Sequence, residues 1–464
     1  MSTISARIER MPFSSFHRRL LLMGGLGYTF DAMDAAVLAF LLPVLRKEWM
    51  LTSVQTGVLG SGTFIGYFLG AMLAGILGDL IGRKRVMMYA LVIYCIASLA
   101  SAVAHDWPFF LATRIVAGLG TGAESAIVAP FLSEFVARRY RGAFTGSLAG
   151  FFSFGFVAAA LLGYLVIPLS PNAWRWVMVI TALPIVMLLW WRRALPESPR
   201  WLVARGRHDE AEAIVAQAEA ELRAAGVKLE SLPETDAAAA SVVPIAAERA
   251  SAQRASALAN VKALWSRNLA RITAMTWIMW LSITFSYYAF FTWIPSLLVQ
   301  NGMTITRSFS YSLVIYIAQI PGYFSGAWLN EKIGRQATIA SYMVLGGVSA
   351  LGLALTRSDA GIMASGVLLS FFMNGTYAGV YAYTPEVFPT DVRATGVGMA
   401  SSIGRLGAIA APILVGYVYP ILGFGGVFGA TTFVLVVGAL AVVVMGVPTR
   451  GRSLEDIAAT QLRG

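Results

Sequence analysis

The stretch Gly75-Ile-Leu-Gly-Asp-Leu-Ile-Gly-Arg-Lys-Arg85 lies between two long apolar runs of the chain. It combines one acidic residue, a glycine where the chain must turn, and three consecutive cations. Part of it returns 252 positions later, where Glu331-Lys-Ile-Gly-Arg335 stands in register with Asp79-Leu-Ile-Gly-Arg83. The pairing of a turn glycine with charges at the end of an apolar run predicts a short loop at a membrane surface.

A second motif repeats at the same offset. Glu134 and Arg141, with six residues between them, correspond to Glu386 and Arg393. Two motifs that recur in one register indicate that the chain consists of a duplicated half.

Composition excludes an ordinary soluble protein. Of the 464 residues, 57% are hydrophobic and only 13% are charged, against roughly 25% charged residues in soluble domains. The single cysteine, Cys95, excludes an intrachain disulfide and gives no support to a thiolate metal site. A net charge of +11 could indicate nucleic-acid binding, but the cations gather in short loops between apolar runs, which is typical of cytoplasmic loops.

The apolar runs predict an all-α polytopic membrane protein, because each has the roughly 20 residues that a bilayer-spanning helix needs. Six spans, a polar linker and six further spans give a half at 1–195, a cytoplasmic linker at 196–262 with a helix at 208–225, and a second half with a tail at 263–464. The twelve expected spans are 20–45, 55–79, 86–104, 108–137, 142–167, 174–194, 268–299, 308–330, 336–356, 360–386, 393–418 and 424–447.

The loop cations predict the orientation. The loops after the second and fourth spans carry Arg83–Arg85 and Arg138–Arg141, whereas those after the third and fifth carry no Lys or Arg. Because positive loops stay inside, we expect both termini and the linker in the cytoplasm of a bacterium, with the protein in the inner membrane. Arg46-Lys47, after the first span, is a local exception that Glu48 offsets only in part.

Small residues on the second span predict close helix packing. Gly62, Gly66 and Gly70 are four apart, so they share one helix face. Such spacing lets helix backbones approach closely in lipid, which we favour over a ligand site.

The duplicated charges predict a cytoplasmic gate. Acidic residues near a membrane face are costly unless they are paired. Each half therefore should hold one charge cluster whose ion pairs form and break as the protein switches, although the same charges could simply anchor helix ends. The expected members are Asp79, Arg83, Glu134, Arg141, Glu331, Arg335, Glu386 and Arg393.

These motifs and the twelve spans resemble the major facilitator superfamily. Pro196-Glu-Ser-Pro-Arg-Trp-Leu202 and Pro448-x-x-Gly451-x-x-Leu454-Glu455 look like its sugar-porter and organic-ion branch. Several narrower stretches resemble bacterial niacin transporters of the NiaP type, which are related to synaptic vesicle glycoprotein 2 and to organic anion and cation transporters. These are Tyr28–Asp34, Phe285–Pro295, Ala318–Ser325 and Tyr381–Glu386.

Four ionisable residues fall near span centres, which makes them candidates for function. They are Asp31 and Asp34 in the first span, Glu124 in the fourth and Arg405 in the eleventh. In this architecture substrate sites lie near the bilayer midplane. Arg405 stays protonated and its planar fork suits a carboxylate. The duplication does not preserve it, since Ser153 holds its position in the first half. The resemblance also implies a cation here, as in organic anion transporters.

The carboxyl groups are candidates for proton coupling, because a desolvated carboxyl can titrate near neutrality. We favour Asp34 and Glu124, with Asp31 third. The alternatives are that one of them only balances Arg405 or Arg114, and that transport is uncoupled facilitated diffusion.

Aromatic side chains gather at the same depth in the second half, and their hydroxyl groups need partners in lipid, which favours a cavity over simple packing. A planar pyridine ring could stack there and accept a hydrogen bond from Tyr, Asn374 or Gln319. The resemblance adds Phe152, at a position that relatives with small aromatic ligands use. The expected aromatic members are Trp280, Tyr287, Tyr288, Tyr377 and Tyr381.

The function hypothesis is a monomeric secondary transporter that imports nicotinate, or a similar small aromatic monocarboxylate, by alternating access with proton symport. Few Asn and Gln residues lie in the spans, which argues against a hexose. Transport of another aromatic acid or an organic cation stays open, as does a non-transporting receptor on the same fold, and nicotinate versus nicotinamide is undecided. The sequence has no nucleophile–base pair, metal-ligand spacing or phosphate loop, so we expect neither an enzyme nor a bound cofactor.

Overall fold

Helices account for the regular structure of the described residues, which are 3–224, 226–227, 229, 261–389 and 392–450 in a computed structural model. The chain forms two compact units. The first comprises Met1–Val37 with Gly62–Val243, and the second comprises Leu38–Ser61 with Pro244–Gly464. The expected division differs from these units in two respects. Residues 38–61, at the end of the first span and the start of the second, group with the C-terminal part of the chain, and the described linker helices belong to the first unit.

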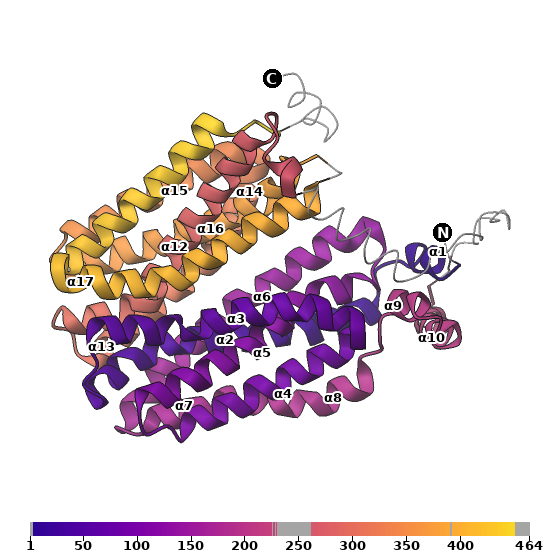
Figure 1. Ribbon diagram of the computed structural model, residues 1–464, viewed down its shortest axis with the longest axis horizontal. Coiled ribbons are helices and arrows are strands. Elements are labelled where there is room, and N and C mark those ends of the chain that lie inside the picture. The colour runs from indigo at the N-terminus through magenta and orange to yellow at the C-terminus, as the bar shows by residue number, and fades with distance from the viewer. Residues whose placement is uncertain (1–2, 225, 228, 230–260, 390–391, 451–464) are drawn as a thin grey trace. The chain divides into compact units, whose positions relative to one another are not determined.

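The helices of the N-terminal part follow the expected order, and Figure 1 shows them in indigo to magenta. They are α1 (Thr3–Glu9), α2 (Ser15–Glu48), α3 (Ser53–Ile81), α4 (Arg83–Ala102), α5 (Trp107–Ser133), α6 (Arg138–Leu165), the 3-10 turn η1 (Ile167–Leu169), α7 (Ala173–Thr181), η2 (Leu183–Val186), α8 (Met187–Ala194), α9 (Pro199–Ala204) and α10 (His208–Ala224). The helix expected at 208–225 is therefore present as α10.

The C-terminal part contains longer helices, several of them broken. They are α12 (Ala270–Gln300), α13 (Ile305–Ile317), α14 (Gln319–Lys332), α15 (Arg335–Leu355), α16 (Asp359–Glu386) and α17 (Arg393–Met445). Gly423, with φ 64° and ψ −165°, separates two helices within α17. The signature residues Gly451–Glu455 lie outside the described residues.

The helices correspond to a multi-pass membrane protein. Within the described residues, nine segments are long and apolar enough to cross a bilayer, with α17 counted once. Three further spans are expected from the sequence. They correspond to the second helix of α17, to α16, which is less apolar, and to α13 and α14 taken together, which are both short helices. The last of these spans is interrupted at Ala318, between α13 and α14. Pro321, in the first turn of α14, has no N–H to donate to the end of α13.

One face of α3 shows how these helices meet lipid. Met72, Ile76 and Leu80 follow one another at intervals of four residues and are about 60% exposed (60%, 63% and 59%). In water such an apolar stripe would be unfavourable. In a bilayer it is the expected lipid-facing surface.

Glycine holds the turn in both copies of the opening motif. Gly82 has φ 103° and directly precedes α4, and Gly334 has φ 93° and directly precedes α15. Residues with a Cβ avoid this left-handed region, so the turn requires glycine in both halves.

Close helix packing is confirmed on α3. A Cβ added to Gly66 would lie 1.8 Å from the carbonyl oxygen of Ile115 on α5, and one added to Gly70 would lie 2.0 Å from that of Leu119. The duplicate contact exists in the second unit, where a Cβ added to Gly322 on α14 would lie 2.3 Å from the carbonyl oxygen of Phe371 on α16. Both halves therefore use glycine to bring the same pair of helices together.

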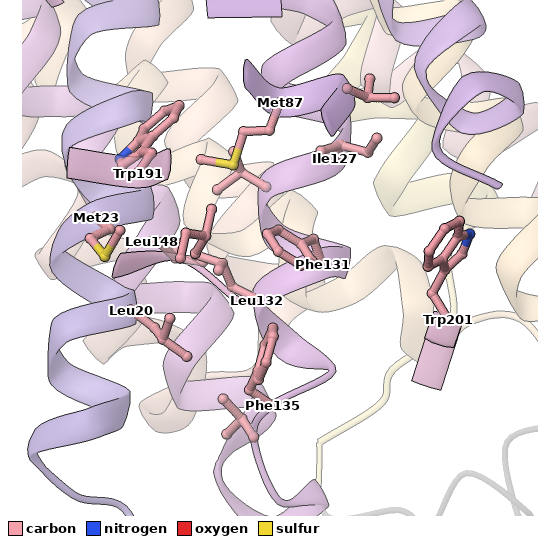
Figure 2. Packing of buried hydrophobic residues seen from close by; sticks show 14 of the residues in the cluster. Leu20, Met23, Met87, Ile127, Phe131, Leu132, Phe135, Leu148, Trp191 and Trp201 are labelled. Atoms are coloured by element: carbon pink, nitrogen blue, oxygen red, sulfur yellow. The ribbon is translucent and has the colours of Figure 1, made fainter. Parts of the chain in front are cut away.

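Large apolar side chains fill the core of the first unit. Figure 2 shows residues from five helices around one centre: Leu20 and Met23 (α2), Met87 (α4), Ile127, Phe131 and Leu132 (α5), Leu148 (α6) and Trp191 (α8). The cluster continues to α1, α9 and α10, through residues such as Ile8, Trp201 and Val215. The N-terminal helix and the linker helices are thus packed onto the first unit, beside each other in Figure 1.

Candidate functional site

An ion pair occupies the interior of the first unit. The guanidinium of Arg114 on α5 donates from Nη1 to both carboxylate oxygens of Asp34 on α2, at 3.1 and 3.2 Å. Both side chains are fully buried. Ser98 donates to Asp34 Oδ1 at 2.8 Å, and Arg114 also donates to the hydroxyls of Ser98 and Ser101 on α4. Because both charges are paired and hydrogen-bonded, this is an environment in which an ionised Asp34 is stable.

Two further carboxyl groups lie nearby with far fewer partners. Asp31 Oδ2 accepts a hydrogen bond of 2.8 Å from Ser125, whereas its Oδ1 has no partner among the described residues. Neither oxygen of Glu124 has a hydrogen-bond partner in the described part of the chain, and its side chain is fully buried. An unpaired carboxylate there would cost several kcal/mol, so the neutral acid suits this site.

Gly27 and Trp191 mark the surroundings of Glu124. A Cβ on Gly27 would lie 2.5 Å from Glu124 Oε1 and 3.2 Å from the Trp191 ring. The glycine on α2 therefore makes room for the carboxyl group of α5 beside an indole from α8. The residues that sequence reasoning did not name here are Ser98, Ser101, Ser125 and Trp191. Hydroxyl groups at the depth of a buried acid were the available signal.

In the second unit, the expected aromatic residues do come together. Ring centroids of Tyr287 lie 5.1 Å from Tyr288 and 5.3 Å from Tyr377. Trp280 lies 5.1 Å from Tyr381, which stacks on Tyr377 at 6.0 Å. These five residues of α12 and α16 are called the aromatic cluster below.

The polar ends of the aromatic cluster are held by hydrogen bonds within the unit. Trp280 Nε1 donates to Thr384 Oγ1 at 2.9 Å, and Tyr377 donates to Thr284 Oγ1 at 3.3 Å. Tyr287 donates to Gln319 Oε1 at 3.0 Å. The rings are therefore fixed in orientation, as a stacking surface requires.

Gln319 and Asn374 differ in what they have left to donate. Gln319 begins α14, directly after the helix break, and its side chain is only 1% exposed. Its Nε2 has no hydrogen-bond partner among the described residues, although its Oε1 accepts from Tyr287. Asn374 Nδ2 instead donates to the carbonyl oxygen of Ser370, one helical turn earlier. Gln319 is thus the amide with an unused donor beside the rings.

Arg405 and Phe152 occupy different units. Gly404, the residue before Arg405 on α17, packs against the aromatic cluster: a Cβ there would lie 3.0 Å from both Trp280 and Thr284. This contact puts the backbone of Arg405 next to the cluster. Phe152, on α6 of the first unit, stacks on Tyr28 with ring centroids 4.5 Å apart.

The charges of the gate form matching networks in the two units. Arg83 Nη2 lies 3.0 Å from Asp79 and its Nε lies 3.7 Å from Glu134. Arg335 Nη2 lies 2.9 Å from Glu331 and its Nε lies 3.1 Å from Glu386. In each unit, one arginine bridges two carboxylates that come from different parts of the duplicated motifs.

Arg141 and Arg393, the other two arginines of the expected gate, hydrogen-bond to backbone carbonyl groups. Arg141 Nε donates to the carbonyl oxygens of Val136 (2.9 Å) and Ser133 (3.2 Å), and Arg393 Nε donates to that of Phe388 (3.2 Å). Val136 and Phe388 are duplicate positions, so each arginine secures the same turn. The carboxylate partner of Arg141 is Glu9 of α1, at 3.0 Å, which sequence reasoning did not identify.

The signature segment after α8 adds contacts to the charge network around Arg83 in the first unit. Glu197 Oε1 accepts from the backbone N–H groups of Arg83 (3.1 Å) and Lys84 (3.2 Å), at the N-terminus of α4, where an anion is stabilised. Ser198 hydrogen-bonds to Glu134, and Trp201 Nε1 donates to the carbonyl oxygen of Asp79 at 3.0 Å. The motif is visible in the sequence, whereas its contact partners can be identified only from the fold.

An ion-pair cluster joins α1 to α10 outside the membrane-spanning helices. Glu219 accepts from Arg10 (2.7 Å) and from Arg7 (2.9 and 3.0 Å). Burial alone would raise the pKa of Glu219, but the hydrogen bonds and charges of the two arginines outweigh it and lower that pKa. Glu219 therefore stays ionised at neutral pH and holds the N-terminal helix on the linker helix.

The described residues contain no set of side chains arranged as metal ligands. Across the described ranges, no group of three or more His, Cys, Asp or Glu side chains is placed to hold a metal ion.

Comparisons with known proteins indicate a membrane transporter, in agreement with the apolar helices. The profile of the family described as sugar (and other) transporter matches residues 23–460. The niacin transporter NiaP of Acinetobacter baylyi is 40% identical over 97% of this chain and 99% of its own length. A putative niacin/nicotinamide transporter NiaP of Bacillus subtilis is 35% identical over 96% and 100%. The inward open conformation of the Escherichia coli xylose transporter XylE has a TM-score of 0.74 and 16% identity, covering 96% of this chain and 99% of that one.

Proposed function

Because the chain belongs to the sugar (and other) transporter family of the major facilitator superfamily, we propose that it imports nicotinate, or a closely similar aromatic monocarboxylate, by alternating access with proton symport. The name and high coverage of the two niacin-transporter relatives support this substrate class. The proposal includes placement in the bacterial inner membrane, with both termini in the cytoplasm.

The observation that carries the substrate assignment is the unused amide donor of Gln319 beside the aromatic cluster. Nicotinate has a flat ring that stacks on aromatic side chains and a ring nitrogen that accepts one hydrogen bond. A buried donor without a partner is unfavourable until such an acceptor arrives. Benzoate has the same ring and carboxylate but lacks the nitrogen, so Gln319 would distinguish the two acids.

Arg405 supplies the charge that the acid needs. Its guanidinium can bind a carboxylate with two parallel hydrogen bonds, and it stays protonated at every physiological pH. Its place on α17, next to the contact of Gly404 with Trp280, supports a position at the edge of the aromatic cluster. The ring would then lie against the tyrosines while the carboxylate faces Arg405.

The proton would be carried by Glu124, with Asp31 as its neighbour. The contacts of Asp34 favour a permanent ion pair with Arg114, whereas Glu124 is better suited to its neutral form. Cycling of Glu124 between neutral and ionised forms requires water to reach it in one state and not in the other. Alternating access provides this exposure, and the networks around Arg83 and Arg335 would break and re-form with it.

One observation favours a second candidate cargo. An organic cation could neutralise Glu124 and Asp31 in place of protons, since both have oxygens without hydrogen-bond partners among the described residues. The test below separates the two cargoes, because a cation gains nothing from Arg405.

Replacing Arg405 by glutamine tests the proposal. In cells that lack their own nicotinate carrier, the wild-type chain should confer uptake of radiolabelled nicotinate. Arg405→Gln should reduce that uptake at least about tenfold, because a charge-assisted, bidentate interaction is lost. Arg357→Gln, at an exposed position between α15 and α16, is the matched control and should transport normally.

Membrane levels of each variant are measured by immunoblotting. Normal nicotinate uptake by Arg405→Gln would remove this residue from the substrate site. Improved uptake of an organic cation by the same variant would favour the second cargo.

A further inference from the structure

A separate cavity of about 500 Å³ lies in the second unit, at the end of α2 that precedes α3. Its walls come from the end of α2 and the loop after it, from the last turns of α12, and from the loop that begins α13. The volume is within the range of small-molecule sites, roughly 300–1,000 Å³. The lining residues are Pro43, Arg46, Lys47, Met50, Leu51, Ser296, Val299, Gln300, Met303, Thr304 and Ile305.

Three of the lining residues have buried polar atoms without hydrogen-bond partners among the described residues. Ser296 is fully buried, and its Oγ has no hydrogen-bond partner among the described residues. Neither Oε1 nor Nε2 of Gln300 has one, and the same holds for Nη1 of Arg46. Arg46 Nη2 is held by Ser53 Oγ at 3.2 Å, so the guanidinium is fixed in place with one edge unused. Buried donors of this kind are costly unless a ligand or water completes them.

The charge of the lining is positive. Arg46 and Lys47 contribute two cations, and none of the described lining residues is a carboxylate. Thr304 caps the 13-residue helix α13 and lines the cavity, so the partially positive N-terminus of that helix lies beside it. Apolar side chains, Val299 and Ile305 among them, form the rest of the wall. The site therefore suits an anion with an apolar body.

The charge pattern of the loops adds a reason to expect function. Arg46-Lys47 is the one pair of adjacent cations in the expected outer loops; the loops after the third and fifth spans carry no Lys or Arg, and two later outer loops carry the single arginines Arg307 and Arg357. Cations at the C-terminus of α2 also stabilise the helix dipole. That role needs only exposed side chains, however, and does not account for the buried, unpaired Ser296 and Gln300.

We propose that this cavity is a second binding site, for a small monocarboxylate, distinct from the site at Arg405. Arg46 binds the carboxylate, Ser296 and Gln300 complete its hydrogen bonds, and the apolar wall holds the ring. By the loop charges this end of the protein faces the periplasm, so the site captures the acid before transport. The identity of that acid as the transported one rests on the proposed function.

The test measures binding of radiolabelled nicotinate to the purified full chain in phosphatidylcholine nanodiscs. The wild type should show two binding components. Arg46→Gln should lose one of them, and Arg405→Gln should lose the other. Ser296→Ala should weaken the Arg46-dependent component about tenfold, since it removes one hydrogen bond to a charged group. Because Ser296 Oγ has no intramolecular partner among the described residues, this variant keeps the fold even if Arg46→Gln does not.

Arg307→Gln is the matched control, because Arg307 is an exposed arginine two residues after Ile305 that does not line the cavity. Identical binding in wild type, Arg46→Gln and Ser296→Ala would overturn the site. So would displacement of nicotinate from the Arg46-dependent component by phosphatidylglycerol, because the occupant would then be a lipid headgroup. Arg46-dependent binding without any nicotinate transport would uphold the site and reject the proposed function.

Discussion

Gln319 is the residue most directly tied to the choice between similar aromatic acids. Its side-chain oxygen accepts a hydrogen bond from Tyr287, while its side-chain nitrogen, at the start of α14, has no partner among the described residues. Discontinuous helices are common at transporter binding sites, because they allow polar groups to be offered inside the membrane. The nitrogen of a pyridine ring fits this donor.

Replacing Gln319 by leucine should remove discrimination between nicotinate and benzoate. One hydrogen bond contributes about 1–1.5 kcal/mol, so affinity for nicotinate should fall about tenfold, while affinity for benzoate stays the same. Competition of each acid against radiolabelled nicotinate measures both. Equal losses for the two acids would mean that the substitution only disturbs the aromatic cluster, and that the ring nitrogen is bound elsewhere.

At this scale the sequence predicted which aromatic residues lie together better than it predicted the partners of the buried charged residues. The aromatic cluster could be predicted from i, i+4 and i, i+7 spacings, because a helix places such residues on one face. The different hydrogen-bond environments of Asp34 and Glu124 could not be predicted from the sequence. Arg114 is ten positions before Glu124 on the same helix, and only the packing of α2 and α4 against α5 decides which carboxylate it pairs with.

Among the helices, α3 shows how one residue type sets the distance between neighbours. Gly66 and Gly70 meet backbone carbonyl groups of α5, so at these positions no flexible side chain lies between the two helices. Gly75 lies on the same helix, and an added Cβ there would meet nothing within 4 Å. Gly66 and Gly75 therefore form a matched pair for comparison.

Gly66→Ala should therefore destabilise the protein by about 1–3 kcal/mol, because the Cβ would lie 1.8 Å from a carbonyl oxygen. Gly75→Ala should be neutral or slightly stabilising, because alanine is the better helix former. Thermal unfolding of the two purified variants in detergent gives the comparison. A similar melting temperature for both would show that α3 and α5 are not packed this closely.

Element boundaries were predictable where a local signal exists. Gly82, Gly334 and Gly423 each end or divide helices close to the expected positions, because their φ values exclude other residues. The interruption between α13 and α14, just before Pro321, could not be predicted, since the surrounding residues are mostly apolar. Likewise, the grouping of residues 38–61 with the second unit depends on tertiary contacts, such as the hydrogen bond from Ser61 to the carbonyl oxygen of Ile409.

Across the whole molecule, the duplication separates machinery from specificity. The bridging arginines, the turn glycines and the helix contacts are present in both halves with similar geometry. The proposed binding residues are not, because Arg405, Asp34 and Glu124 correspond to Ser153, Ser286 and Thr376. A gate must act from both halves, whereas a cargo and a proton each need a single site.

The most direct measurement is nicotinate accumulation in proteoliposomes that contain only the purified chain. An imposed inward proton gradient should drive nicotinate above equilibrium, and collapsing the gradient should abolish accumulation while nicotinate exchange continues. Glu124→Gln should exchange nicotinate without accumulating it under any gradient. Absence of nicotinate movement in both assays, or accumulation that survives collapse of the proton gradient, would contradict proton-coupled nicotinate transport.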